Sequence, residues 1–317
     1  MALPPGAYTW AVGQRAAHLG ALLPSYARAA ESLAYLTGIT MSARELELCA
    51  EGLGAAYTLP ELPPGERGPR AEVLYVAADA VQLHFRDVKP WHEEKVFCVW
   101  RQTGATLHPP RYWTADGPWD THLAALQTLA EGEGLLTARV VVCLGDGAPP
   151  LWTLLTALAP QAVQVLDWYH VQEHLAQVAT LLAEGAAWHQ IQRVHLREGQ
   201  RRLVLRELAA LARHASVEAV RTAARSCLGY LWRHRTRLNY ALARARGYPI
   251  GSGRIESACK LVVQQRCKGP GMRWEHTQAE AVLHARCAWL NDDWRRACQL
   301  WRATGHFAPR QEVKAAA

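Results

Sequence analysis

The sequence predicts an α/β protein in which a mixed β-sheet is combined with an N-terminal helical segment and a long all-helical region. Residues 10–56 carry apolar side chains at helical spacing, whereas residues 71–167 alternate strand-like apolar runs with helical ones. Residues 168–246 contain no strand pattern. Half of the 317 residues are hydrophobic, which excludes general disorder and indicates a chain that buries a core.

The N-terminal segment, residues 1–56, is expected to form helices. A helical pattern over Ser25–Leu36 is broken at Gly38, and Ser42 with Glu45 three residues later forms a capping box that begins the next helix. This is the outline of a helix–turn–helix. Because the second helix carries three glutamates, which would repel phosphates, a structural helical pair is favoured over a DNA-reading motif.

A Pro- and Gly-rich linker at residues 57–70 separates these helices from the predicted sheet. The strands are expected at Glu72–Asp79, Val81–Phe85, Lys95–Trp100, Arg139–Leu144 and Ala162–Leu166, with helices over Thr121–Ala130 and after Pro149. The resulting order is β-β-β-α-β-α-β. The unbroken apolar run in the fourth of these strands is typical of a strand buried on both faces.

The pattern is helical from residue 168 onward. Apolar residues keep helical spacing up to residue 246, and Gly247 and Pro249 then end the region. A Gly-Ser-Gly turn leads into a further helix over Ile255–Gln265.

Charge is divided unevenly along the chain. Residues 1–187 hold 11 basic and 19 acidic side chains, whereas residues 188–317 hold 24 basic and 9 acidic ones. This split indicates an acidic half that can gather cations and a basic half that faces a polyanion. Of the 35 basic residues 30 are Arg, whose planar guanidinium suits phosphate, although an arginine-rich proteome would give the same bias.

Several classes of protein are excluded or disfavoured by the composition. The chain has no apolar run of 18 residues, so we expect no membrane-spanning helix, and its start lacks the pattern of a secretion signal. Eight scattered cysteines include no C-x-x-C pair, which favours reduced cytosolic thiols over a zinc cluster or a disulfide framework. No P-loop or dinucleotide-binding glycine motif is present.

Three acidic residues stand out by their positions. Asp79 and Asp146 each lie at the end of an apolar strand, and Glu256 lies in the first turn of the helix after the Gly-Ser-Gly turn. Each has a structural alternative, because aspartates cap turns and a glutamate in a first helical turn favours the helix dipole. Together, however, two aspartates and a glutamate can hold two Mg²⁺ ions for phosphoryl transfer.

The residues around these acids resemble the Kra-type insertion-sequence transposases, which are DDE transposases related to the mutator-like superfamily. The resemblance covers about residues 15–300. It is carried by Trp91-His92-Glu93-Glu94-Lys95, Leu144-Gly145-Asp146-Gly147-Ala148-Pro149, Leu166-Asp167-Trp168-Tyr169-His170 and the stretch PIGSGRIESACKLVVQQRCKGPGMRW from Pro249 to Trp274. The Gly-Ser-Gly-x-x-Glu-Ser-x-x-Lys segment within the last stretch is the most specific.

This resemblance implies an RNase H-like mixed-sheet catalytic core with an all-helical insertion. Asp79, Asp146 and Glu256 correspond to the catalytic acids and the ligands of two Mg²⁺ ions, with Mn²⁺ possible in their place. Asp167 and His170 match a supporting D-x-x-H motif. The expected parts are residues 1–56 (N-terminal helices), 57–70 (linker), 71–167 (first part of the core), 168–246 (all-helical insertion) and 247–317 (second part of the core, with the Glu-bearing helix).

The basic half supplies the expected contacts to DNA. Arg193, Arg197 and Arg201 are spaced to lie on one helical stripe, and Trp274 is expected to be an exposed indole that stacks on a base near the cut. The other expected DNA-binding residues are Arg254, Lys260, Lys268 and Arg273. The alternatives are a solvated helix face for the arginines and core packing for Trp274.

We therefore expect a bacterial, cytoplasmic transposase that acts at the nucleoid, cleaves element ends with Mg²⁺ and transfers them to target DNA. It would act as a homodimer or larger assembly on DNA and would not bind membranes. The alternatives are an inactive remnant that only binds DNA and a stand-alone nuclease. Ala80, where the family usually has glycine, and a start after the family's zinc-type segment favour the remnant.

Overall fold

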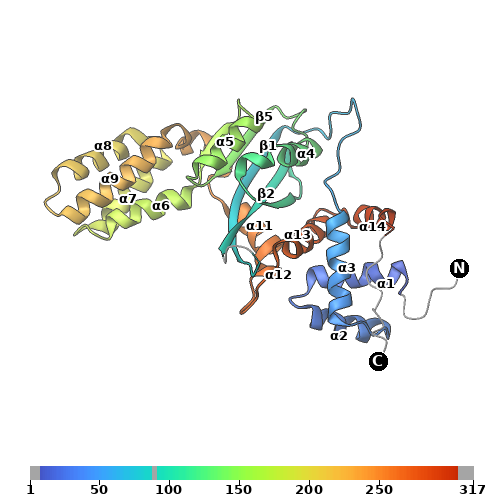
Figure 1. The fold of residues 1–317 in the computed structure, drawn as a ribbon. Coiled ribbons are helices and arrows are strands. Elements are labelled where there is room, and N and C mark those ends of the chain that lie inside the picture. The colour runs from blue at the N-terminus through green and yellow to red at the C-terminus, as the bar shows by residue number, and fades with distance from the viewer. Residues whose placement is uncertain (1–7, 88–90, 306–317) are drawn as a thin grey trace.

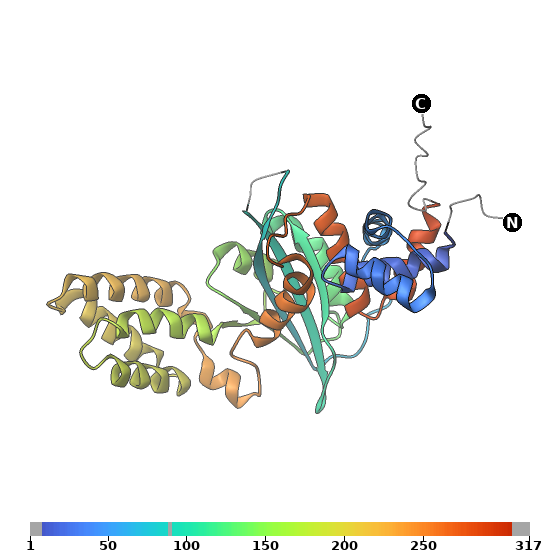
Figure 2. The ribbon, with the colours of Figure 1, turned by 90° about the horizontal axis from the view of Figure 1, so that it is seen from below.

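The computed structural model describes residues 8–87 and 91–305, and its elements form three parts (Figures 1 and 2). A β-sheet with covering helices occupies the middle of the molecule. A bundle of helices extends from one side, and the N-terminal helices lie on the other side beside the last helices of the chain. Within the described residues, no helix combines the length and the apolar character needed to cross a membrane.

The sheet is mixed and confirms the predicted α/β fold class. Its strands follow the order β3-β2-β1-β5-β6, and β4 also pairs with β2. The pairs β1–β2 and β2–β4 are antiparallel, whereas β1–β5 and β5–β6 are parallel, which is the RNase H-like arrangement. The strands are β1 (Val73–His84), β2 (Trp91–Thr103), β3 (Thr106–Leu107), β4 (Arg111–Asp116), β5 (Val140–Gly145) and β6 (Val163–Leu166).

The observed order is β-β-β-β-α-β-α-β, and it differs from the predicted β-β-β-α-β-α-β in the antiparallel strands. The segments Glu72–Asp79 and Val81–Phe85 form the single strand β1, because Asp79 and Ala80 stay in the ladder opposite Val96 and Lys95. The strands β3 and β4 were not predicted. Ala80 does not have a positive φ, so this position does not require glycine.

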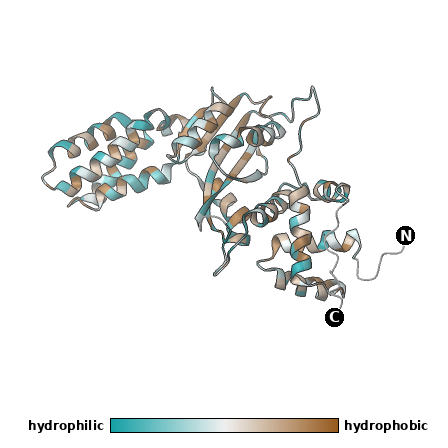
Figure 3. Ribbon diagram, viewed as in Figure 1, coloured by the Kyte–Doolittle hydropathy of each residue, from teal (hydrophilic) through white to brown (hydrophobic). Residues whose placement is uncertain are grey.

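Short helices cover the sheet between its parallel strands. Helix α4 (Leu123–Gly132) precedes β5, and α5 (Pro149–Leu158) connects β5 to β6. Valine, cysteine and leucine side chains of β5 are buried, as expected for a strand covered on both faces. In Figure 3 brown predominates in the middle of the sheet, whereas each helix of the bundle that extends from one side shows both teal and brown.

The N-terminal helices are α1 (Trp10–Leu22), α2 (Tyr26–Thr37) and α3 (Ala43–Ala56), and α3 has the predicted capping box of Ser42 and Glu45. Helix α3 packs against α1 and against α13 (His276–Leu290) and α14 (Trp294–Ala303), which is consistent with the structural role favoured by the sequence. The residues 57–70 contain neither helix nor strand.

The all-helical insertion begins directly after β6. It consists of α6 (Trp168–Ala179), α7 (Gly185–Arg197), α8 (Arg201–His214), α9 (Glu218–Arg233) and α10 (Tyr240–Ala245). Each of the longer helices is amphipathic and buries a stripe of apolar residues, such as Val204 and Leu208 on α8 and Ala224 and Leu231 on α9. Helices α8 and α9 pack against each other.

The chain returns to the sheet through the helix that carries Glu256. This helix consists of α11 (Gly253–Ala258), a π-helical stretch over Cys259–Gln264 and α12 (Gln265–Cys267). It packs against β1 and β2, which places the Glu-bearing helix beside the strand that carries Asp79. π-Helical turns are frequent at functional sites, because they shift the direction of the side chains that follow.

Candidate active site

Strand register brings three aspartates to one edge of the sheet. The parallel ladders pair Ala77 with Leu144 and Gly145 with Leu166. Two residues beyond the first pair, Asp79 comes to lie beside Asp146. One residue beyond the second pair, Asp146 comes to lie beside Asp167. The Asp167 backbone N–H donates to the Gly145 carbonyl at 2.8 Å, so the β5–β6 pairing extends to this edge. The carboxylates therefore come from adjacent strands at the carboxyl end of the parallel part of the sheet.

Asp79 is a half-buried carboxylate whose pKa reflects the neighbouring acids. Burial raises its pKa, and the negative charges of Asp146 and Asp167 raise it further. One carboxylate oxygen accepts from the Ala80 backbone N–H at 2.7 Å, and the other lies 3.9 Å from the Cys259 Sγ. A divalent cation beside this carboxylate would relieve the repulsion that raises its pKa.

Asp146 lies in the loop between β5 and α5. Its Oδ1 accepts from the Ala148 backbone N–H at 2.8 Å, and its backbone carbonyl accepts from the Trp152 indole N–H at 2.6 Å. Both bonds fix the loop that holds Asp146 directly after β5.

Asp167 holds two other segments in place. Its Oδ1 accepts from the backbone N–H groups of Tyr169 at 3.1 Å and Ser252 at 3.0 Å, so it caps α6 and ties the Gly-Ser-Gly turn to β6. Its Oδ2 lies 2.5 Å from the His170 Nδ1. Burial alone would raise the pKa of Asp167, but the hydrogen bonds from His170 and Tyr169 outweigh it and lower the pKa.

Asp79, Asp146 and Asp167 together form an acidic row along this edge of the sheet. His170 lies at the edge of the acidic row and not among apolar side chains. Its hydrogen bond with Asp167 raises its pKa to about 9, and the charges of Asp167 and Asp146 act in the same direction. At neutral pH the imidazole is therefore positively charged, and 43% of its side-chain surface is exposed. It provides a cation next to the carboxylates that remains open to solvent.

Glu256 is exposed on α11 and is connected to the aspartates through Ser252. The Ser252 hydroxyl donates to Glu256 Oε1 at 2.7 Å, and the Ser252 backbone N–H donates to Asp167. One turn after Glu256, Cys259 faces Asp79. Yet within residues 8–87 and 91–305 no three His, Cys, Asp or Glu side chains are gathered as a ready metal-binding group. The shared metal site of Asp79, Asp146 and Glu256 therefore stays a prediction.

The predicted arginine stripe is divided between two helices. Helix α7 ends at Arg197, Gly199 has a φ of 78°, and Arg201 begins α8. The prediction that Arg193, Arg197 and Arg201 share one helical face is therefore wrong, because the left-handed glycine turns the chain between them. The Arg197 guanidinium instead lies 5.5 Å from the centre of the Trp168 ring.

Trp274 is buried, which contradicts the prediction of an exposed indole. Only 7% of its surface is exposed, its indole N–H donates to the Cys267 carbonyl at 3.1 Å, and Arg266 stacks on it. Its backbone pairs with the end of β1 at Phe85, which draws the ring into the core. A base cannot stack on this side chain without a rearrangement of the core.

The other predicted DNA contacts lie on or near the Glu-bearing helix. Lys260, Lys268 and Arg273 are exposed. Arg254 is half-buried, with its guanidinium 5.1 Å from the centre of the Trp100 ring. The three exposed cations can meet phosphates, whereas Arg254 also has a packing role.

Sequence reasoning missed Tyr230, which reaches the site from the insertion. Its ring stacks on His174 at 3.9 Å and lies against Gly147, the residue after Asp146. Burial raises the pKa of Tyr230, and the charges of Asp146 and Asp167 raise it further. A separation of 84 positions from Asp146 gave no local signal for this contact, whereas the Gly-Ser-Gly turn did mark Ser252.

Comparisons with known proteins leave the family open. No protein-family model matches the chain, and no curated protein matches it. Among solved structures, a crystal structure of NurA with manganese is similar at 10% identity and a TM-score of 0.16, covering 80% of this chain and 60% of that one. This TM-score is below the level that indicates a shared fold, so the RNase H-like class is established by the sheet topology alone.

Proposed function

We propose that the protein is a DNA transposase that cleaves element ends with Mg²⁺ and joins them to target DNA. The observation that carries this proposal is the alignment of Asp79 and Asp146 on adjacent strands, with Glu256 connected to the same edge through Ser252. Acids converging from adjacent strands and a late helix are suited to phosphoryl transfer, which depends on positioning and on charge stabilisation.

The donor groups fit a hard divalent cation. Carboxylate oxygens are the ligands that Mg²⁺ prefers. The pKa of Asp79 is raised first by burial and then by the like charges of Asp146 and Asp167, which a cation would neutralise. Asp79 and Asp146 would hold the ions. Glu256 would become a further ligand by giving up its hydrogen bond with Ser252. Bound there, Mg²⁺ or Mn²⁺ would stabilise the attacking and leaving oxygens of the phosphodiester.

The protein's own side chains would orient the DNA around these acids. His170 presents a positive charge at the edge of the row, where it can attract the phosphate beside the scissile bond. Lys260 on the Glu-bearing helix, and Lys268 and Arg273 after its end, are exposed and would hold the flanking backbone. Asp167 would act as a positioning residue, because its hydrogen bonds fix His170 and the turn before Glu256.

The transposase assignment, as distinct from nuclease activity, comes from the resemblance of the motifs to Kra-type elements. The same resemblance implies a cytoplasmic location in a bacterium, action at the nucleoid, and assembly of two or more copies on paired DNA ends. Joining of cleaved ends to a second DNA is the reaction that distinguishes it from the alternatives.

The test uses purified protein and labelled duplexes taken from the DNA that flanks its gene. Asp79→Asn, Asp146→Asn and Glu256→Gln should each reduce Mg²⁺-dependent cleavage by about 10³-fold or more, and pairs of changes should cost little beyond single ones. The matched control is Asp120→Asn, which removes the same charge from an exposed site before α4.

Each outcome separates the candidate functions. Cleavage followed by joining to target DNA supports a transposase. Cleavage without joining identifies a stand-alone nuclease, and DNA binding without cleavage identifies an inactive remnant. Full cleavage by a single acid variant would remove that residue from the site.

A further inference from the structure

A groove with an apolar floor and a basic rim lies between α8 and α9 of the insertion. It has a volume of about 710 Å³ and is lined by one stripe of each helix. On α8 the stripe runs from Arg202 to His214 at spacings of three and four residues, and on α9 it runs from Arg225 to Trp232. At 1.5 Å per residue, the α8 stripe is about 18 Å long.

Small residues open the groove and large cations border it. Ala209, Ala210 and Gly229 lie at its middle, where they leave space between the two helices. The rim includes Arg202, Arg206, Arg213 and Arg225, whereas no acidic side chain lines the groove in the described chain. The insertion as a whole, residues 168–246, carries 13 arginines against five glutamates. The groove therefore favours an anionic occupant with flat apolar parts.

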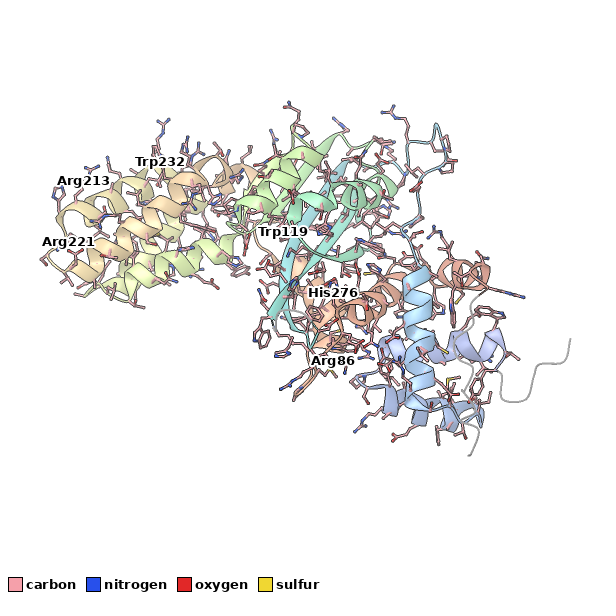
Figure 4. The ribbon with its side chains drawn as sticks, in the orientation of Figure 1. Arg86, Trp119, Arg213, Arg221, Trp232 and His276 are labelled. Atoms are coloured by element: carbon pink, nitrogen blue, oxygen red, sulfur yellow. The ribbon has the colours of Figure 1, made fainter. Side chains whose placement is uncertain are left out.

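Trp232 lies at the end of the groove that is nearer the acidic row. Its surface is 57% exposed, and the Arg235 guanidinium lies 4.9 Å from the centre of its ring. Tyr230, two residues earlier on the same helix, contacts Gly147 beside Asp146. Figure 4 shows Trp232 and Arg213 along the same edge of the insertion. The groove thus runs from the outer end of the insertion to the end of α9 that lies nearer the candidate active site, while Trp232 and Tyr230 point to different sides of this helix.

We propose that this groove binds single-stranded DNA, with an unpaired base stacked on Trp232 and the phosphates held by the rim arginines. This role rests on the proposed function in taking DNA as the substrate. Packed helices lie only about 8–10 Å apart, so a duplex could touch the rim but not reach the floor. Unpaired bases can enter such a slot, and aromatic stacking with arginine contacts is the usual way of holding a single strand.

Two other occupants fit the groove less well. A second copy of the chain would bring a similarly basic insertion against these arginines. An acidic amphipathic helix would match the rim charge, but the exposed indole, stacked with Arg235 at the end nearest the acids, is better suited to a base than to a helix.

The test measures fluorescence anisotropy of a labelled oligothymidylate of about 15 nucleotides and of a duplex of equal length, both in EDTA. Trp232→Ala and Gly229→Phe, which fills the slot, should each weaken single-strand binding by about tenfold and duplex binding by less than about twofold. The control Gly229→Ala should bind normally, because a Cβ there meets nothing within 4 Å.

A charge-matched pair tests the rim. Arg206→Glu should weaken binding of the oligothymidylate more than Arg302→Glu, which makes the same change on α14 at the opposite end of the molecule. Circular dichroism should show unchanged helix content in all variants. Binding in EDTA needs no catalysis, so a wild type that does not cleave DNA, or acid variants that cleave it fully, would defeat the proposed function without affecting this measurement.

Three results would overturn the assignment. Equal losses for single-stranded and duplex DNA would assign the groove to general electrostatic binding, and no loss in Trp232→Ala and Gly229→Phe would remove it from DNA binding. Displacement of the oligothymidylate by an acidic amphipathic helical peptide that binds more tightly would make the groove a protein-binding site.

Discussion

At the scale of single residues, the acidic row depends on a compensating cation. Asp146 and Asp167 both raise the pKa of Asp79, and three carboxylates at one edge would repel each other strongly if nothing offset them. His170 offsets part of this repulsion, because its hydrogen bond with Asp167 keeps the imidazole protonated at neutral pH. The D-x-x-H spacing thus has a physical role before any metal or DNA binds.

The Asp167–His170 pair should give the protein a defined pH dependence of stability. The pKa of His170 rises from 6.5 in the unfolded chain to about 9 in the folded one, so its contribution is complete below pH 6.5 and disappears as the pH rises through 9. Thermal unfolding of the wild type and His170→Gln between pH 6 and 10 measures this. The Tm difference should be largest at pH 6 and shrink toward pH 10, and a constant difference would contradict the assigned pair.

At the scale of elements, the sequence predicted the strands by their apolar runs and erred where a polar residue lies inside one. Asp79 was assigned to a strand end, yet β1 continues past it because β2 pairs along its whole length. The strand β4 was missed because its six residues mix aromatic and charged side chains, and its pairing with β2 decides its conformation.

The candidate site was predictable only in the part that local sequence encodes. Asp146 and Asp167 follow apolar strands, and the Gly-Ser-Gly turn precedes Glu256, so each gave a local signal. The burial of Trp274 and the approach of Tyr230 depend on contacts with segments far along the chain, which a single sequence does not encode in any pattern. Gly199 was a readable helix end that separates Arg197 from Arg201.

Close packing of two helices should make Gly54 sensitive to the smallest substitution. A Cβ at Gly54 on α3 would lie 1.7 Å from the Ala281 carbonyl oxygen of α13, so Gly54→Ala must push these helices apart. We expect a loss of about 2 kcal/mol or more in the free energy of unfolding. Urea denaturation checks this, with Gly229→Ala as a helical glycine control that should be neutral or stabilising. A change at Gly54 as mild as the control would contradict the predicted contact.

At the scale of the whole molecule, the sheet lies between two helical parts that pack against different elements. The N-terminal helices pack on α13 and α14, whereas the insertion extends from the edge that carries the acidic row (Figures 1 and 2). The insertion is anchored to that edge by α6, which Asp167 caps, and by α9, whose Tyr230 covers Gly147. Movement of the insertion would therefore act directly on the loop that holds Asp146.

This anchoring predicts that Gly147 and Tyr230 are energetically coupled. A Cβ at Gly147 would lie 2.2 Å from the Tyr230 Cε2, so Gly147→Ala must displace the ring or the loop and should cost about 1–3 kcal/mol of stability. Once Tyr230→Ala has removed the ring, the same change at Gly147 should cost little. A double-mutant cycle measured by urea denaturation gives the coupling free energy directly.

The cleavage rate provides a second measure of the same contact. Because Asp146 adjoins Gly147, Gly147→Ala should slow Mg²⁺-dependent cleavage even at temperatures where the variant is fully folded. The double variant, in which Tyr230→Ala is added to Gly147→Ala, should cleave faster than Gly147→Ala alone. Gly132→Ala is the control, since a Cβ at that position meets nothing within 4 Å. Strictly additive effects on stability would show that the insertion is not energetically coupled to the loop that holds Asp146.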